Sequence, residues 1–181
     1  MLVEVNRKNY KKIIKNTRKY IHEKNIKYMF SDDLEEEIKE NIKNIETAIN
    51  LKKIEERYNF IYDTICSYLD NQYINNNLCG FDENNVCEYY RKIDKNHYNG
   101  CCYRSDRSLC NYFDEKQKKC IEKCISCKLY SCPYLRNRGI NYKINEFPLI
   151  KYFFNIRQKL VIKYSFFKPK LYVMHQLMEK R

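Results

Sequence analysis

Cysteines are the side chains of this chain best suited to chemistry. The chain has 181 residues and ten cysteines. A core does not need thiols at high density for packing, so clustered cysteines predict either metal ligation or disulfide pairing. Cys66 lies upstream, and the other nine lie between residues 79 and 132, as Cys79, Cys87, Cys101, Cys102, Cys110, Cys120, Cys124, Cys127 and Cys132.

The flanking sequence favours metal over disulfides. Residues 1–10 contain no continuous apolar segment of the kind found in a signal peptide. The most apolar C-terminal segment, residues 147–167, contains several lysines and an arginine and is too charged to span a membrane. We therefore expect a cytoplasmic protein in a reducing compartment, where cysteine frameworks bind metal more often than they form disulfides. An exported disulfide protein with an unrecognised signal remains the alternative.

The spacing of the cysteines suits four-thiolate sites. Two residues separate Cys124 from Cys127, so both thiolates can reach one ion from a single turn. Cys101 and Cys102 are adjacent, and successive side chains of an extended chain diverge, so they fit two different ions better. Zinc takes four tetrahedral ligands and favours thiolate, and an iron–sulfur cluster also takes four cysteines. The sequence does not separate zinc from iron–sulfur.

Nine thiols are enough for two such sites. Cys120, Cys124, Cys127 and Cys132 are close in sequence, so bringing them together costs little loop entropy. The remaining cysteines, Cys101, Cys102 and Cys110 with Cys79 or Cys87, form the second group, and Cys120 fits either group. Cys66 lies within a helical apolar stripe and is predicted to be a buried thiol outside both sites.

Two known cluster motifs share part of this spacing. Cys120-x3-Cys124-x2-Cys127 has the spacing of the radical-SAM motif, which stands near the start of a large barrel, whereas too few residues follow Cys127 here for a barrel. Cys124-x2-Cys127-x4-Cys132-Pro133 is similar to the ferredoxin run that ends in Cys-Pro, but its last spacing is one residue too long. Neither match is therefore close enough to predict a radical-SAM or a ferredoxin cluster.

A third pattern resembles a known family. Gly100-Cys101-Cys102, then Cys110 followed by Asn-Tyr-Phe-Asp, and then Cys120, resembles the YkgJ-type cysteine-cluster family. The resemblance implies zinc or iron chelation. This chain lacks the Arg-Pro step before the family's last cysteine, and Cys124, Cys127 and Cys132 are additional.

Enzyme signatures are otherwise missing from the sequence. The chain has only three glycines, which leaves no phosphate-cradling loop. His97 precedes Cys101 by four residues and could activate it as a nucleophile, but among so many thiols His97 is expected to be a loop residue or an alternative metal ligand. We expect a binding or assembly module and not a self-contained enzyme. An iron–sulfur redox or electron-transfer protein and a zinc-dependent nucleic-acid binder are the alternatives.

The net charge of +12 is unevenly distributed. Residues 1–30 contain nine basic and two acidic side chains, and residues 133–181 contain eleven basic and two acidic ones. Between them, residues 31–78 contain five basic and eleven acidic side chains. The pattern favours either helices that pack with complementary charges or a basic surface at the termini that binds another protein or a nucleic acid.

The predicted fold is mainly α, in three regions: an N-terminal helical region at 1–78, a cysteine-rich metal-binding module at 79–132, and a basic, aromatic helical region at 133–181. Apolar residues at helical spacing predict one basic helix over 6–29. Asp32, with Glu35 three residues later, predicts the cap of the next helix. The apolar stripe of that helix loses phase around residues 50–53, so it is either one long helix or two that meet near residue 51. Together these helices predict an N-terminal helical hairpin or coiled-coil-like pair.

The remaining regions are predicted from turn residues and periodicity. The cysteine-rich module shows no sustained period and is expected to be irregular. Gly139 is expected to close a short turn after Pro133. Asn145 is expected to cap a helix that starts near Pro148 and continues through Tyr164, and a last helix is expected from Pro169.

Overall fold

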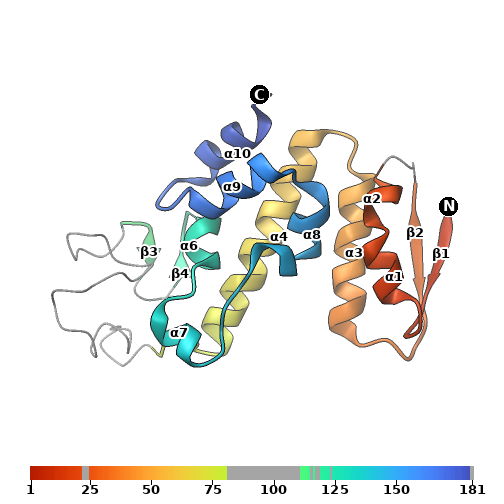
Figure 1. The fold of residues 1–181 in the computed structure, drawn as a ribbon, viewed down its shortest axis with the longest axis horizontal. Coiled ribbons are helices and arrows are strands. Elements are labelled where there is room, and N and C mark those ends of the chain that lie inside the picture. The colour runs from red at the N-terminus through yellow and green to blue at the C-terminus, as the bar shows by residue number, and fades with distance from the viewer. Residues whose placement is uncertain (22–24, 81–110, 115, 117–118, 123, 180–181) are drawn as a thin grey trace. The chain divides into compact units, whose positions relative to one another are not determined.

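The computed structural model describes residues 1–21, 25–80, 111–114, 116, 119–122 and 124–179. Helices dominate these residues, as predicted (Figure 1). The chain divides into two compact units, each formed by two separate segments. The first unit comprises Met1–Thr64 and Ile144–Lys159, and the second comprises Ile65–Lys143 and Leu160–Arg181.

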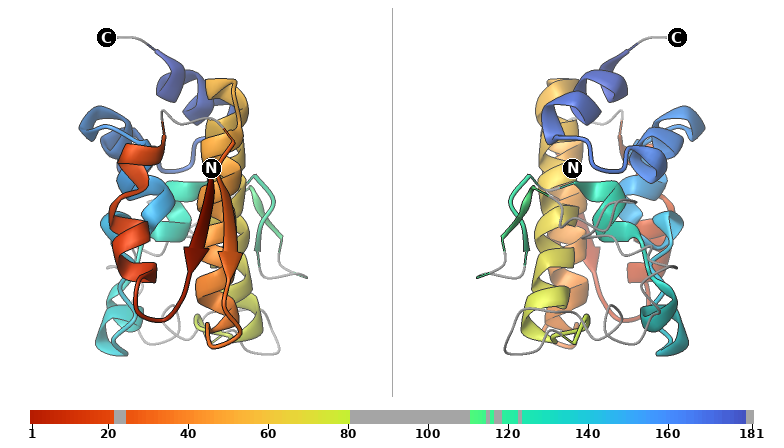
Figure 2. Two further views of the ribbon diagram at one scale, coloured as in Figure 1. Left: turned by 90° about the vertical axis from the view of Figure 1, so that its right-hand side faces the viewer. Right: turned by 90° about the vertical axis from the view of Figure 1, so that its left-hand side faces the viewer.

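The first unit begins with a parallel strand pair. Strand β1 (Leu2–Val5) pairs with β2 (Lys27–Phe30), and the helices α1 (Tyr10–Lys15) and α2 (Thr17–Tyr20) lie on the connection between them (Figure 2). The predicted single helix over 6–29 is therefore wrong. Ile26 and Tyr28 are buried while Lys27 and Met29 are exposed, which is the alternation of a strand with one covered face.

The helical part of this connection is interrupted at Asn16. The side-chain hydroxyl of Thr17 donates a hydrogen bond to the carbonyl oxygen of Ile14 at 2.7 Å. Such local side-chain bonds compete with the helix for backbone groups. Two short helices therefore replace the one continuous helix that the apolar spacing predicts.

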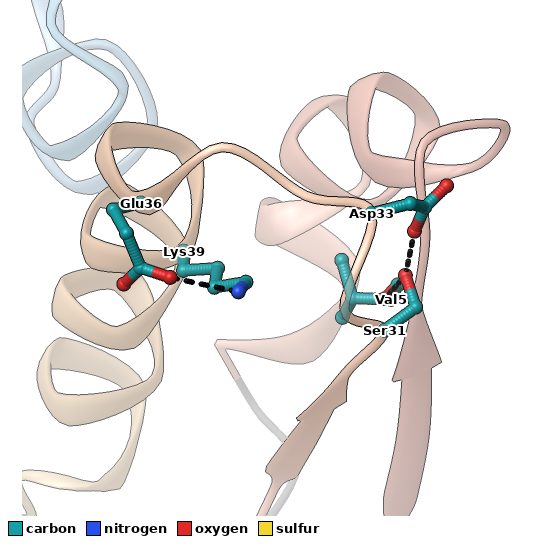
Figure 3. Close-up of polar contacts among 5 residues, drawn as sticks. All are labelled: Val5, Ser31, Asp33, Glu36 and Lys39. Atoms are coloured by element: carbon teal, nitrogen blue, oxygen red, sulfur yellow. Dashed lines mark hydrogen bonds and ion pairs between the residues drawn. The ribbon is translucent and has the colours of Figure 1, made fainter.

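The turn from β2 into the next helix is fixed by Ser31. Its backbone N–H and its hydroxyl both reach the carbonyl oxygen of Val5, at 2.9 and 3.2 Å, and the hydroxyl also contacts the Asp33 carboxylate (Figure 3). Helix α3 (Glu36–Asn50) starts only after Glu35, and no side chain caps it. The predicted cap at Asp32 is wrong, because the acidic turn binds back to the strand. An ion pair of 2.8 Å joins the exposed Glu36 to the partly buried Lys39 in the first turn of α3 (Figure 3).

Two helices follow and meet near residue 51. The alternative of one long helix is therefore excluded. Helix α4 (Ile54–Asn75) starts three residues after Leu51, whose backbone is extended. The Arg57 guanidinium donates to the carbonyl oxygens of Leu51 and Ile49, at 2.7 and 3.3 Å, and so satisfies the end of α3. Cys66 is fully buried on α4, as predicted.

The C-terminal segment of the first unit contains η1 (Ile144–Glu146), α8 (Pro148–Phe153) and the first residues of α9 (Ile156–Tyr164). The N-cap of α8 is Phe147 and not Asn145, and no side chain caps that end. The predicted continuous helix from Pro148 to Tyr164 is wrong, because it breaks at Asn155. Tyr164, at the end of that predicted helix, is 61% exposed.

A reciprocal cap explains the break before α9. The backbone N–H of Gln158 donates to the Asn155 side chain at 2.9 Å, and the backbone N–H of Asn155 donates to the Gln158 side chain at 3.0 Å. This is the capping box, with Asn155 as the N-cap. The buried Gln158 amide also donates to the Tyr58 hydroxyl of α4 at 2.9 Å, and the Tyr58 ring packs on Phe154.

The second unit contains short elements, and three of those described, β3 (Phe113–Asp114), β4 (Lys119–Cys120) and α6 (Ile125–Leu129), lie within the cysteine-rich module that was expected to be irregular. Gly139, at φ +79°, donates its N–H to the carbonyl oxygen of Arg136 and closes the short helix before it, as predicted. Pro169 precedes the last helix, also as predicted. Strands β3 and β4 form an antiparallel pair, and these two helices are α7 (Pro133–Asn137) and α10 (Lys170–Met178).

Within the part of the chain that the structure describes, no helix combines the length and the apolarity needed to cross a membrane.

The Gln158 contacts give a test of this fold. Gln158→Ala removes half of the capping box and a buried hydrogen bond, so we expect the free energy of unfolding to fall by about 1–3 kcal/mol. Tyr58→Phe removes only the hydroxyl that Gln158 contacts. Denaturant unfolding of both variants and of the double variant should give a clear coupling energy. Strict additivity of the two losses contradicts the assigned contact.

Candidate metal centre

Cys124 and Cys127 form a close sulfur pair. Their Sγ atoms are 3.2 Å apart. Cys124 is the N-cap residue of α6 and Cys127 lies within that helix, so a single turn brings both thiols to one side. Both are buried, with 2% and 8% of their surface exposed. The sequence spacing predicted this pairing.

The surroundings of the pair favour negative charge on sulfur. The pKa of the Cys124 thiol is lowered from 9.0 to about 6. The largest cause is the hydrogen bond from the Cys127 thiol, and burial opposes it. Backbone N–H groups of Cys127, Lys168 and Phe167 contribute further lowering. This lowering favours the thiolate of Cys124, which is the form that binds metal.

A strained turn supplies two of these N–H groups. Phe167 has φ +56°, in the left-handed region that a bulky side chain rarely adopts. Its backbone N–H donates to the Cys127 Sγ at 3.4 Å, and the Cys124 thiol contacts the carbonyl oxygen of Ser165 at the same distance. Successive N–H groups around a left-handed residue form a concave anion-binding surface. The strained turn thus faces the two sulfur atoms with hydrogen-bond donors.

Helix α6 is held by polar contacts on several sides. The buried Ser126 hydroxyl donates to the carbonyl oxygen of Ile162 in α9 at 2.5 Å. The Tyr73 hydroxyl of α4 donates to the carbonyl oxygen of Lys128 at 2.6 Å. The Lys128 ammonium forms an ion pair with Asp70 of α4, and these side chains are 5% and 17% exposed. These contacts fix the backbone that carries the two thiols.

The other predicted ligands lie in different places. Cys132 is buried and forms the N-cap of α7, and it does not join the Cys124–Cys127 pair in a possible metal group. Among the described residues, no three His, Cys, Asp or Glu side chains are grouped to hold a metal ion. Cys120 is in β4. Four predicted ligands and His97 lie outside the described residues, namely Cys87, Cys101, Cys102 and Cys110.

Cys79 is half-buried and lies in the turn that follows α4. Its neighbourhood includes Tyr142, whose pKa is raised by burial and then by the charges of Tyr68 and Cys79. Arg138, just after α7, donates to the carbonyl oxygen of Leu78 at 3.3 Å, which holds the segment before Cys79. Cys79 and Cys132 thus both lie next to α7, while their role as ligands stays a prediction.

The sulfur pair fits one edge of a tetrahedral thiolate site. With zinc–sulfur bonds of about 2.3 Å, two ligands of one ion are about 3.8 Å apart. The observed 3.2 Å requires the sulfur atoms to separate by less than one ångström. Backbone N–H groups that donate to ligating atoms are the usual outer contacts of metal sites. The pair therefore suits two of the four ligands that zinc or an iron–sulfur cluster needs.

Sequence reasoning did not find the residues that surround the pair. Phe167 reads as one more apolar residue, and nothing in the sequence signals its left-handed backbone. Lys128 and Asp70 are 58 positions apart, so their pairing depends on the tertiary fold. Only Pro169 signals a restricted backbone nearby, and the residue that it restricts is Lys168.

Comparisons with models of protein families, with curated proteins and with solved structures found no match for this chain.

The thiolate gives a prediction on pH. In metal-free, reduced protein, the ultraviolet absorbance of thiolate should show a step near pH 6 that Cys124→Ser removes and Cys66→Ser leaves unchanged. The pKa of Cys124 is lower in the folded chain than in the unfolded chain, so ionisation of this thiol stabilises the folded state. That stabilisation is complete above the unfolded pKa and is lost as the pH falls through about 6. A step that survives Cys124→Ser contradicts the assignment.

The buried ion pair gives a prediction on stability. Asp70→Asn leaves the Lys128 ammonium buried without its counter-charge, so we expect a loss of about 2–3 kcal/mol, somewhat below the range for a fully buried pair. Glu56→Gln breaks the ion pair with Lys53, in which both side chains are exposed, and is the matched control, with an unchanged Tm. Equal Tm values for the two variants would show that the Asp70 contact does not stabilise α6.

Proposed function

We propose that this chain is a metal-binding cysteine-cluster protein, with zinc or an iron–sulfur cluster, in which Cys124 and Cys127 supply two of the four thiolates of one site. The observation that carries the proposal is the buried sulfur pair, 3.2 Å apart. The donors from the strained turn at Phe167 support it, because strain of this kind persists where the surroundings impose it and often marks a functional site.

Ligation explains this pair better than thiol catalysis. A nucleophilic cysteine has to be both a thiolate and accessible to its substrate. Cys124 meets the first requirement but is only 2% exposed. A buried sulfur with a lowered pKa and backbone N–H donors beside it suits a ligand, so we propose a binding or assembly module and not an enzyme.

The remaining ligands come from the other predicted cysteines. A tetrahedral ion held by Cys124 and Cys127 needs two more thiolates. We propose that two of the other predicted cysteines supply these thiolates. The resemblance of Cys101, Cys102 and Cys110 to the YkgJ-type pattern supports chelation of zinc or iron. Thiolates at this density stay reduced in the cytoplasm, which is where we place the protein. The candidates are Cys79, Cys87, Cys101, Cys102, Cys110, Cys120 and Cys132.

The basic termini are proposed to contact a partner, either another protein or a nucleic acid. The support is the charge pattern, since residues 1–30 and 133–181 together hold twenty basic and four acidic side chains. This proposal is independent of the metal, because its side chains are cations and not ligands.

Elemental analysis of protein purified without oxygen, together with its visible spectrum, tests the proposal. Zinc is colourless, whereas an iron–sulfur cluster absorbs visible light. With two semi-independent sites, Cys127→Ser should remove about half of the metal, because each site needs all of its four ligands. Cys66→Ala is the matched control, since it removes a buried cysteine thiol outside the predicted sites.

Chelation provides a second readout on the same samples. Structural metal can contribute on the order of 10–16 kcal/mol to folding of a small module. Hydrogen exchange across residues 79–132 should therefore become faster after chelation, while α3 and α4 keep their protection. Purified protein without metal, or unchanged protection after chelation, contradicts the proposal. Loss of all metal, or none, from Cys127→Ser contradicts the two-site arrangement.

A further inference from the structure

Two cations from separate helices of the first unit converge on one backbone oxygen, and the residue that carries this oxygen is itself a lysine. The Arg18 guanidinium of α2 donates to the carbonyl oxygen of Lys151 at 3.5 Å, and the Lys159 ammonium of α9 donates to the same oxygen at 2.9 Å. Lys151 itself lies in the last turn of α8. Arg18 and Lys151 are exposed and Lys159 is half-buried. We name Arg18, Lys151 and Lys159 the cation cluster.

The cluster is not neutralised within the described structure. None of its three side chains has a carboxylate partner among the residues that the structure describes. Burial lowers the pKa of Lys159, and the positive charges of Arg18 and Lys151 lower it further. The cations therefore repel one another, and an added anion would relieve that repulsion.

The carbonyl oxygen of Lys151 accepts only some of the hydrogen bonds that the cation cluster can donate. Carbonyls at the end of a helix attract cations, which accounts for one hydrogen bond from Arg18 and one from Lys159. A guanidinium has five N–H donors and an ammonium has three. Most donors of the cluster thus remain for a ligand with several acceptor oxygens.

We propose that the cation cluster binds phosphate groups of a nucleic-acid backbone. Arginine and lysine together are the usual ligands of phosphate, by bidentate donation and by point charge. Helix α1 contacts α2 and adds a further row of basic side chains in the same unit. A repeated phosphate chain matches such an extended set of cations better than a single small anion. The exposed cations of this row are Lys11, Lys12 and Lys15.

This inference narrows the partner proposed above to nucleic acid, and it does not rest on metal binding. It is tested by measuring the affinity of the full, metal-loaded chain for a short fluorescent RNA strand and for a DNA duplex, over a series of salt concentrations. Arg18→Gln combined with Lys159→Gln removes two charges of the cluster. The matched control is Lys27→Gln with Lys52→Gln, which removes two exposed charges from the same unit.

The cluster variant should bind at least one of the two nucleic acids about tenfold more weakly than the unchanged chain, with a salt slope reduced by about two. The control variant should stay within about twofold, because only diffuse attraction is lost. Equal weakening by both variants, no binding of either nucleic acid, or equally tight binding of polyglutamate overturns the proposal. Polyglutamate binding would indicate an acidic protein as the partner. Metal content and circular dichroism of the same samples separate these outcomes from a failure of metal binding or of folding.

Discussion

The second unit depends on the burial of one very short helix. All five residues of α6 are buried, among them a serine and a lysine, yet a helix of this length has no stability of its own in water. Its polar groups are satisfied from α4, through Asp70 and Tyr73, and from α9, through the carbonyl oxygen of Ile162. A buried ion pair contributes little to net stability, but it fixes the position of the element that contains it. What this arrangement fixes is the position of Cys124 and Cys127.

The turn at Phe167 also contacts the pair of Cys124 and Cys127. Phe167 adopts a left-handed backbone at a cost of roughly 1–2 kcal/mol for a side chain of its kind. A glycine would adopt it without that cost, so the turn is not optimised for stability. The hydrogen bond from the Cys127 thiol is the largest cause of the lowered pKa of Cys124, and the N–H donors of this turn lower it further against the opposing effect of burial. The strained turn, the lowered pKa and the packing of α6 therefore all involve the pair of Cys124 and Cys127.

The sequence predicted those features that depend on neighbouring residues. Pro148 and Pro169 mark helix starts, Gly139 closes α7, and the loss of phase near residue 51 separates α3 from α4. It missed features that arise from distant contacts. The pairing of β1 with β2 joins residues 25 positions apart, and Ser31 binds Val5 where a helix cap was expected. The break at Asn155 was locally readable, because Asn-x-x-Gln is a form of the capping box. For the site, the two-residue spacing predicted Cys124 with Cys127, while Lys128, Asp70 and Phe167 required the fold.

Charge is arranged differently in the two units. In the second unit, the buried Lys128 is paired with Asp70, as a folded core requires. In the first unit, Arg18 and Lys159 converge on one carbonyl oxygen although they are far apart in sequence, and their charges oppose each other. Packing does not require this, since either side chain could extend into water. Folded chains tend to violate their own stability rules at functional sites. The sulfur pair and the cation cluster break these rules in different ways, so the proposed metal site and the proposed phosphate site lie on different parts of the chain.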